Sequence, residues 1–217
     1  MIMKNINKIE DYVGNRLVKV LVGQRRVGKS YIMRQLAKNL VLKGVRPENI
    51  LMINKEFESY SFIETHKDLD MFISAYEEKF NPNGRVYIFI DEIQEIEGWE
   101  KMVNSYSQDY SKEYELFISG SNSKMLSSEL STLLSGRYVE FKIFPFSYSE
   151  FCDVNNVASS KQSYLSYMQT GGLPELVNLN GDETKRNYVS ALKDTILLKD
   201  IIHRHQIKDV SLPEDIF

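Results

Sequence analysis

The hydrophobic positions of this chain form short strand patterns that alternate with amphipathic helical patterns. Apolar runs rich in β-branched and aromatic residues predict five strands, at Leu17–Val22, Ile50–Ile53, Val86–Ile90, Tyr114–Ser119 and Tyr138–Ile143. Apolar residues at helical spacing predict helices between them, at Lys29–Lys43, 66–80, Trp99–Tyr110 and Ser123–Leu134. Strands that alternate with helices build βαβ units. We therefore expect an α/β fold, a three-layer sandwich with a five-stranded, mainly parallel sheet.

The pattern changes after about residue 147, where strand signals stop and only helical ones remain. These helical segments are interrupted at Gly171-Gly172-Leu173-Pro174, and a long helix is predicted from about Glu183 to His203. We expect a core at 1–146 and a small helical subdomain at 147–205. The S-x-x-E pattern at 211–214 announces one more helix, so we expect 206–217 to begin a further region of a longer protein.

Composition and charge are those of an ordinary globular protein, with 42% hydrophobic residues and a net charge of −3. The sequence lacks an apolar run long enough for a membrane span and an N-terminal secretory signal. With one cysteine, Cys152, these features lead us to expect a cytoplasmic protein without a membrane partner. Residues 1–50 hold 11 Lys and Arg against 3 Asp and Glu, which would suit a phosphate ligand. On charge counts alone, however, solvated helix faces are the favoured explanation.

One segment carries a specific chemical motif, G-x-x-x-x-G-K-S, between a predicted strand and a predicted helix. Its residues are Gly23, Gln24, Arg25, Arg26, Val27, Gly28, Lys29 and Ser30. In such a loop, backbone N–H groups and the helix N-terminus surround a pyrophosphate, the lysine contacts the β- and γ-phosphates, and the serine hydroxyl ligates Mg²⁺. The motif predicts binding of ATP and Mg²⁺, with Tyr31 continuing the binding segment.

Asp91 and Glu92 follow the apolar strand Val86–Ile90 and form the second candidate element. We expect Asp91 to hold the Mg²⁺ shell and Glu92 to polarise the attacking water. An Asp-Glu pair at a strand end can also simply close a turn, but the upstream phosphate loop favours the catalytic interpretation. Glu92 also favours hydrolysis over storage of the nucleotide.

Two further polar residues are candidates for the catalytic site. Asn122, with Ser121, ends the next predicted strand, where it would face the γ-phosphate or the water; the alternative is a helix N-cap. Arg137 is a candidate arginine finger, acting from a neighbouring subunit or after a domain movement; the alternative is a surface arginine at a strand start.

Five segments together resemble the prokaryotic predicted ATPases of the AAA+ class. In chain order they are GQRRVGKS, FIDEIQ, FISGSNS, LSGRYVEFKIFPFSYSEF and TGGLPE, and the resemblance covers roughly residues 15–205. It implies an ASCE-type sheet, with an extra strand between the phosphate-loop strand and the Asp91-Glu92 strand. It makes Asn122 a sensor residue and implies that Pro174 touches the nucleotide from a helical lid, although this proline can also be a helix breaker. In that class a winged helix and a C-terminal domain of unknown function follow, so 206–217 would start a truncated winged-helix region.

These observations favour Mg²⁺-dependent ATP binding and hydrolysis that drives a conformational switch. This switch would act on a macromolecular partner, protein or DNA, and the chain could form a homo-oligomer. A module that binds ATP without hydrolysing it is the first alternative, and a small-molecule kinase is the second. Glu92 and Ser121-Asn122 argue against the kinase, because transfer to a small acceptor does not need an activated water.

Overall fold

The computed structural model describes residues 2–121, 134 and 136–195. The chain divides into two compact units, Met1–Phe144 and Pro145–Phe217. The predicted helix at Ser123–Leu134 and the end of the predicted helix at Glu183–His203 fall outside the described residues, apart from Leu134. Among the helices that are described, none has both the length and the apolar character needed to cross a membrane.

The first unit is built on one five-stranded sheet. Its strands are β1 (Val18–Val22), β2 (Ile50–Asn54), β3 (Val86–Asp91), β4 (Tyr114–Gly120) and β5 (Tyr138–Lys142). They lie in the order β2-β3-β4-β1-β5, and every neighbouring pair is parallel. The α/β fold is therefore confirmed, and so is the extra strand: β4 lies between β1 and β3.

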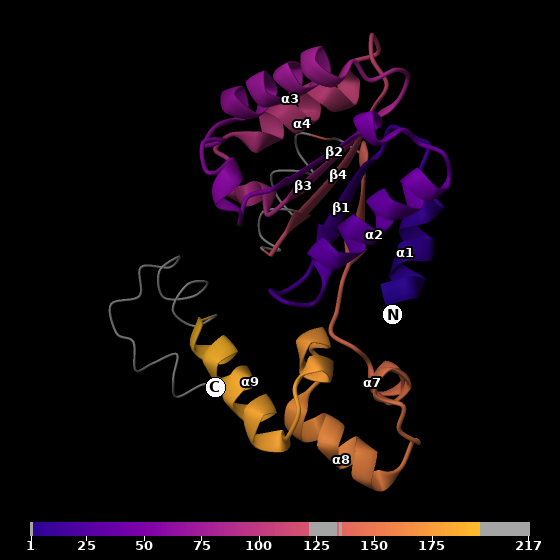
Figure 1. Ribbon diagram of the computed structural model, residues 1–217, viewed down its shortest axis with the longest axis vertical. Helices are drawn as coiled ribbons and strands as arrows, with labels where there is room; N and C mark the ends of the chain where they lie inside the picture. The colour runs from indigo at the N-terminus through magenta and orange to yellow at the C-terminus, as the bar shows by residue number, and fades with distance from the viewer. Residues whose placement is uncertain (1, 122–133, 135, 196–217) are drawn as a thin grey trace. The chain divides into compact units, whose positions relative to one another are not determined.

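Helices cover both faces of this sheet (Figure 1). The pair α1 (Ile2–Glu10) and α2 (Lys29–Leu42) lies on one face, and α3 (His66–Phe80) and α4 (Trp99–Gln108) lie on the other. Every residue of β1, β3 and β4 is buried, as expected of strands covered on both sides. Successive side chains alternate between the two faces, so β1 places Val18, Val20 and Val22 in the cluster with α3 and α4.

Helix α1 was not predicted, because its pattern is short and its stability depends on contacts with α2. Ile6 and Ile9 are almost completely buried. The Glu10 carboxylate accepts hydrogen bonds from Asn39 at 2.8 Å and Lys43 at 2.9 Å, both from the end of α2. Short 3₁₀ helices η1 (Pro47–Asn49), η2 (Glu58–Tyr60) and η3 (Ile93–Glu95) were likewise not predicted, as a single turn leaves little periodicity.

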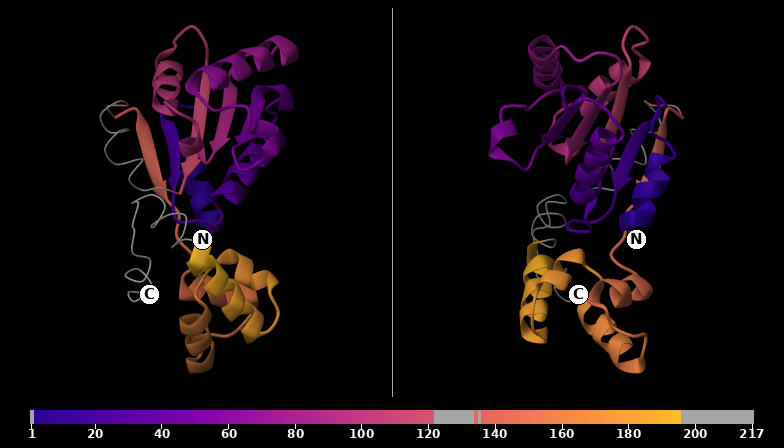
Figure 2. Two further views of the ribbon diagram at one scale, coloured as in Figure 1. Left: turned by 90° about the vertical axis from the view of Figure 1, so that its left-hand side faces the viewer. Right: turned by 45° about the vertical axis from the view of Figure 1, so that its right-hand side comes forward.

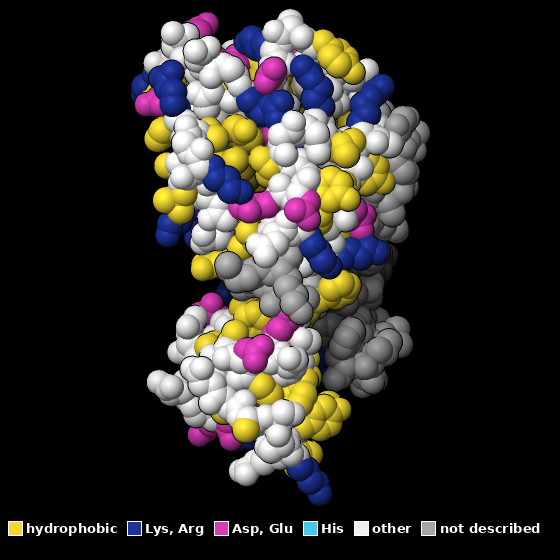
Figure 3. Space-filling view, turned by 90° about the vertical axis from the view of Figure 1, so that its right-hand side faces the viewer, with side chains coloured by type: hydrophobic (Ala, Val, Ile, Leu, Met, Phe, Trp, Pro, Cys, Tyr) yellow, Lys and Arg dark blue, Asp and Glu magenta, His cyan; other side chains and the backbone are white. Residues whose placement is uncertain are grey.

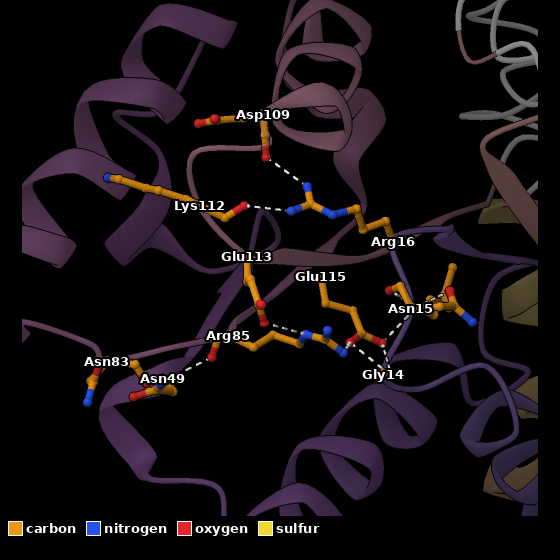
Figure 4. Close-up of polar contacts among 11 residues, drawn as sticks. Gly14, Asn15, Arg16, Asn49, Asn83, Arg85, Asp109, Lys112, Glu113 and Glu115 are labelled. Atoms are coloured by element: carbon orange, nitrogen blue, oxygen red, sulfur yellow. Dashed lines mark hydrogen bonds and ion pairs between the residues drawn. The ribbon is translucent and has the colours of Figure 1, made fainter.

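The amino edge of the sheet carries a buried polar network around Glu115 (Figure 4). Lys19 and Glu115 are completely buried and pair at 2.6 Å. Arg85 lies 3.3 Å from the other carboxylate oxygen, and the Gly14 N–H donates to both oxygens. Burial lowers the pKa of Lys19, and Glu115 opposes that shift. The network satisfies a buried charge and ties the segment after α1 to the sheet.

The second unit is helical in its described part (Figure 2). It contains α7 (Tyr148–Asn155), α8 (Lys161–Thr170), η4 (Pro174–Asn178) and α9 (Asp182–Thr195). The glycine interruption has a packing reason, since a Cβ on Gly172 would lie 2.0 Å from the Phe146 carbonyl oxygen. The Phe146 N–H donates to the Gly172 carbonyl at 2.6 Å, and the Tyr167 hydroxyl donates to the Phe146 carbonyl.

Candidate nucleotide-binding site

The loop from Gly23 to Gly28 joins β1 to α2 in a conformation that few sequences allow. Gly28 precedes the helix with a φ of 97°, and Arg26 has a φ of 65°. A Cβ on Gly23 would lie 2.2 Å from the Ile143 carbonyl oxygen, so only glycine fits there. Val27 is buried and anchors the loop. The loop ends at the N-terminus of a 14-residue helix, where the helix dipole favours an anion.

Lys29 is buried inside this loop, with only 4% of its side chain exposed. Its ammonium group donates to the carbonyl oxygens of Gly23 at 3.0 Å and Gln24 at 3.1 Å. It also lies 3.6 Å from Glu92 Oε1. Burial lowers the pKa of Lys29, whereas the carboxylates of Glu92 and Asp91 act to raise it. The cation of the motif and both predicted carboxylates thus form one cluster at the carboxyl edge of the sheet.

Asp91, the last residue of β3, is held by side chains from the two neighbouring strands. The Ser119 hydroxyl on β4 donates to Asp91 Oδ1, and Asn54 Nδ2 at the end of β2 donates to Oδ2 at 3.3 Å. All three residues are buried. Sequence reasoning missed Asn54 and Ser119. A signal existed, because both occur at the carboxyl ends of predicted strands, where parallel sheets gather their functional side chains.

Glu92 begins the turn after β3 and has a left-handed backbone, with a φ of 53°. Its N–H donates to the Ser119 hydroxyl at 3.4 Å, so Ser119 contacts both acidic residues. Its side-chain Oε2 accepts a hydrogen bond from the Gln94 amide. A non-glycine residue in this region costs on the order of 1 kcal/mol and persists only where its surroundings hold it.

A cavity of about 270 Å³ lies beside Asp91. Ser30, Asn54 and Asp91 form its polar part, and Met33, Met52 and Phe57 form much of its apolar part. The hydroxyl, amide and carboxylate oxygens on its wall are the hard donors that Mg²⁺ prefers. Asp91 retains lone pairs beyond its two hydrogen bonds, so the residues present fit a magnesium ion.

The other loop residues lie further toward solvent. Gln24 and Arg26 are exposed, and Arg25 forms an ion pair of 3.8 Å with Glu56. Tyr31 on α2 is 57% exposed. Their predicted contacts with nucleotide stay predictions, as does that of Pro174, which is the first residue of η4 in the second unit.

Arg137 lies at the amino ends of the strands, whereas the phosphate loop follows the carboxyl end of β1. Its carbonyl oxygen accepts a hydrogen bond from the Val18 N–H at the start of β1, and its guanidinium contacts Asn104 Oδ1 at 3.4 Å. The length of β1, about 13 Å, separates this position from Gly23. Arg137 therefore does not contact the site of its own chain in this structure, and its role in a neighbouring subunit stays a prediction. Asn122 falls outside the described residues.

Comparison with known proteins agrees with this geometry. A family model described as an AAA domain matches residues 15–152. The chain belongs to the AAA domain family. The match extends from before β1 into α7, so it contains the whole sheet, the phosphate loop and the acidic pair.

Two curated relatives of this AAA domain are uncharacterised proteins. One, from Haemophilus influenzae, is 38% identical over 199 residues, which are 90% of this chain and 48% of the relative. The other, from Methanocaldococcus jannaschii, is 29% identical over 204 residues, 89% of this chain and 44% of the relative. The chain thus spans about half the length of these relatives.

Solved structures share the fold at low sequence identity. Cdc6p from Pyrobaculum aerophilum has a TM-score of 0.57 at 13% identity, with 78% of this chain and 54% of that chain covered. The Thermotoga maritima RuvB Holliday junction branch migration motor has a TM-score of 0.53 at 14% identity, with 99% of this chain and 68% of that chain covered. The replication initiator DnaA bound to AMPPCP and single-stranded DNA has a TM-score of 0.53 at 11% identity, with 95% of this chain and 70% of that chain covered. The shared feature is the fold of P-loop AAA+ ATPases.

Proposed function

We propose that this AAA domain binds Mg-ATP at residues 23–30 and hydrolyses it, and that hydrolysis drives a conformational switch acting on a macromolecular partner. One observation carries the proposal. The Lys29 ammonium lies 3.6 Å from the Glu92 carboxylate, with Asp91 beside them, in a buried cluster next to the phosphate loop. A phosphate-binding cation, a metal-binding carboxylate and a candidate base are thus within reach of one ligand.

Binding would exchange one set of Lys29 partners for another. In the structure, Lys29 is satisfied by two loop carbonyl oxygens and by Glu92. Phosphate oxygens would replace these partners, while the N-terminus of α2 supports the same charge. Ser30 and Asp91 would hold Mg²⁺, with Asn54 beside them. When bound, the ion neutralises charge on the phosphate oxygens.

Hydrolysis would then use the carboxylate that Lys29 has left. The oxygen of a water forms a bond to the γ-phosphorus, and its proton passes to Glu92. The bond from the γ-phosphorus to the bridging oxygen breaks, which leaves ADP and inorganic phosphate. Because Lys29 lies 3.6 Å from Glu92 Oε1, its withdrawal to the phosphates would leave this oxygen accessible to the water, so binding of ATP would itself prepare the base.

DNA is the first partner to test. Two proteins that share the fold are a Holliday junction branch migration motor and a replication initiator bound to single-stranded DNA. On the face drawn in Figure 3, Lys and Arg side chains are dispersed among acidic and hydrophobic ones. The described residues on this face form no continuous basic track (Figure 3). DNA binding is tested by the fluorescence anisotropy of labelled single-stranded and duplex oligonucleotides, with and without Mg-ATP. Equal anisotropy with and without protein under both conditions would exclude DNA.

Lys29→Ala and Glu92→Gln test the nucleotide chemistry. We expect Lys29→Ala to abolish Mg-ATP binding in calorimetry, because it removes the buried cation of the loop. Glu92→Gln should bind like the unaltered chain while phosphate release falls about 10²-fold or more, since an amide cannot take the proton. Lys38→Ala, on the exposed side of α2, is the matched control for loss of a lysine.

The outcomes separate the candidate functions. Hydrolysis by Glu92→Gln at the unaltered rate would remove Glu92 from the catalytic role. Binding without hydrolysis by the unaltered chain would favour a nucleotide-binding module, and transfer of phosphate to a small molecule would favour a kinase.

A further inference from the structure

Gln94, to which the sequence reasoning assigned no role, contacts the candidate base. It lies in η3, one residue beyond Ile93, and its Nε2 donates to Glu92 Oε2. The same nitrogen lies 3.5 Å from the Ser121 hydroxyl oxygen, just after β4. An amide NH₂ group has two hydrogens, so it can serve both acceptors at once. Gln94 thus joins the turn after β3 to the end of the neighbouring strand.

The two carboxylate oxygens of Glu92 face different partners. Oε1 lies toward Lys29 at 3.6 Å, and Oε2 accepts from Gln94. If Lys29 turns to the phosphates when ATP binds, the contact with Gln94 still holds Oε2. The carboxylate would then keep its orientation, with Oε1 available to accept the proton of the attacking water.

The backbone around Gln94 is well supported. The Glu92 N–H is bound to Ser119, and the turn is closed by the Glu95 N–H, which donates to the Glu92 carbonyl at 3.1 Å. Ile93 and Ile96, which flank Gln94 and Glu95, are almost completely buried in the core. The side chain that orients the base therefore extends from a rigid turn, as precise positioning requires.

The placement of Gln94 is not explained by stability. Its amide oxygen is buried and has no hydrogen-bond partner among the described residues. A buried acceptor without a partner lowers stability. The opposite orientation of the amide would bring this oxygen against the Glu92 carboxylate, which is repulsive, so the NH₂ group must face Glu92. The unpaired amide oxygen thus lowers stability, while the NH₂ group of the same side chain binds Glu92.

We propose that Gln94 is a positioning residue that holds the Glu92 carboxylate oriented for attack of water on ATP. The inference rests on the proposed hydrolysis at this site. It predicts that loss of the Gln94 NH₂ group lowers turnover and leaves ATP affinity unchanged, because the hydrogen bonds that Gln94 makes with described residues go to Glu92 and Ser121, which lie outside the phosphate loop.

Gln94→Ala and Gln94→Glu separate this role from simple packing. Glutamate has nearly the shape of glutamine, but it lacks the NH₂ group and repels Glu92. We expect kcat to fall about tenfold to a hundredfold in Gln94→Ala, and further in Gln94→Glu, with Mg-ATP affinity in calorimetry close to that of the unaltered chain. Glu95→Ala, exposed on the same turn, is the control. Nearly full activity of Gln94→Glu beside an impaired Gln94→Ala would mean packing and overturn the proposal.

A double-mutant cycle gives a second readout. In the Glu92→Gln background, Gln94→Ala should cause no further loss of turnover, because the group that it positions is absent. An additive loss would overturn the proposal. If the unaltered chain hydrolyses ATP and all Gln94 variants match it, only this inference fails. If the unaltered chain binds ATP without hydrolysing it, the proposed function fails and takes the inference with it.

Discussion

At the scale of single residues, the candidate site gathers unusual backbone conformations. Arg26, Gly28 and Glu92 all have positive φ values, of 65°, 97° and 53°. Two of these are not glycine, and side chains resist this region by about 1 kcal/mol or more. Both belong to the loop and turn that present Lys29 and the acidic pair. The surrounding core supplies the stability that keeps these conformations.

Gly23 shows how closely the loop is packed, and Gly23→Ala tests it. The added methyl group would lie 2.2 Å from a backbone oxygen of Ile143, so one of the two segments must move. We expect loss of Mg-ATP affinity together with a lower melting temperature, measured by calorimetry and thermal unfolding.

Gly44→Ala is the control for this variant. Gly44 has a φ of 93° with open space around it, so its alanine variant should cost about 1 kcal/mol of stability and leave ATP affinity unchanged. An unchanged affinity in Gly23→Ala would show that the close approach does not shape the nucleotide site.

At the scale of elements, two tyrosine hydroxyls attach α3 to its neighbours. Tyr106 on α4 donates to Asp70 at 2.8 Å, and Tyr114 on β4 donates to Glu77 at 2.7 Å. Burial, followed by these hydrogen bonds, raises the pKa of both phenols, that of Tyr114 to about 12. The layer of α3 and α4 is thus held by neutral phenols as well as by apolar contacts.

Alkaline unfolding tests the Tyr114 contact. A phenol with a folded pKa of about 12 stabilises the fold fully below its unfolded pKa, and this contribution is lost as the pH rises from about 10 toward 12. Between about pH 9 and about pH 11, the stability of the wild-type chain relative to Tyr114→Phe should fall by about 1 kcal/mol in urea unfolding.

Tyr110→Phe, at a residue that is 79% exposed, is the control and should show no such change. Parallel pH curves for the wild-type chain and Tyr114→Phe would contradict the assignment of the raised pKa.

At the scale of the whole molecule, the two edges of the sheet differ in chemistry. The amino edge carries the buried pair of Lys19 and Glu115, whereas the carboxyl edge carries Asp91 and Glu92 beside the phosphate loop. Arg137 lies at the amino edge, exposed to solvent. For an arginine there to reach a nucleotide, the nucleotide would have to lie on a neighbouring copy of the chain, or a domain movement would have to bring Arg137 to the site of its own chain.

Mixing two inactive variants tests the contribution of Arg137 in trans. The Arg137→Ala variant keeps the candidate base Glu92 but lacks the arginine. The Glu92→Gln variant keeps Arg137 but lacks the base. If Arg137 acts across an interface, each variant alone should hydrolyse ATP slowly, and a mixture should regain turnover as total protein concentration rises. Full activity of Arg137→Ala alone, or a mixture no faster than its components, would rule out the finger.

The strands and the phosphate loop were predictable because local signals are strong there. The start of α2 at Lys29 agrees with the prediction, and each predicted strand differs from the observed one by about one residue at its ends. Helices α2 and α4 end slightly earlier than predicted, at Leu42 and Gln108, since apolar spacing alone does not mark a helix end. The single turn η3 is too short to show a period, whereas α1 was not predicted although its apolar residues lie at helical spacing.

The sequence alone determined the α/β class and the position of the nucleotide loop, because strand periodicity and the glycine spacing of the loop are local properties. It also placed Asp91 and Glu92 at the end of the right strand. Only the tertiary structure decided which side chains hold these carboxylates. Asn54, Ser119 and Gln94 come from three segments of the chain, and they meet Asp91 and Glu92 because parallel strands end at one edge of the sheet.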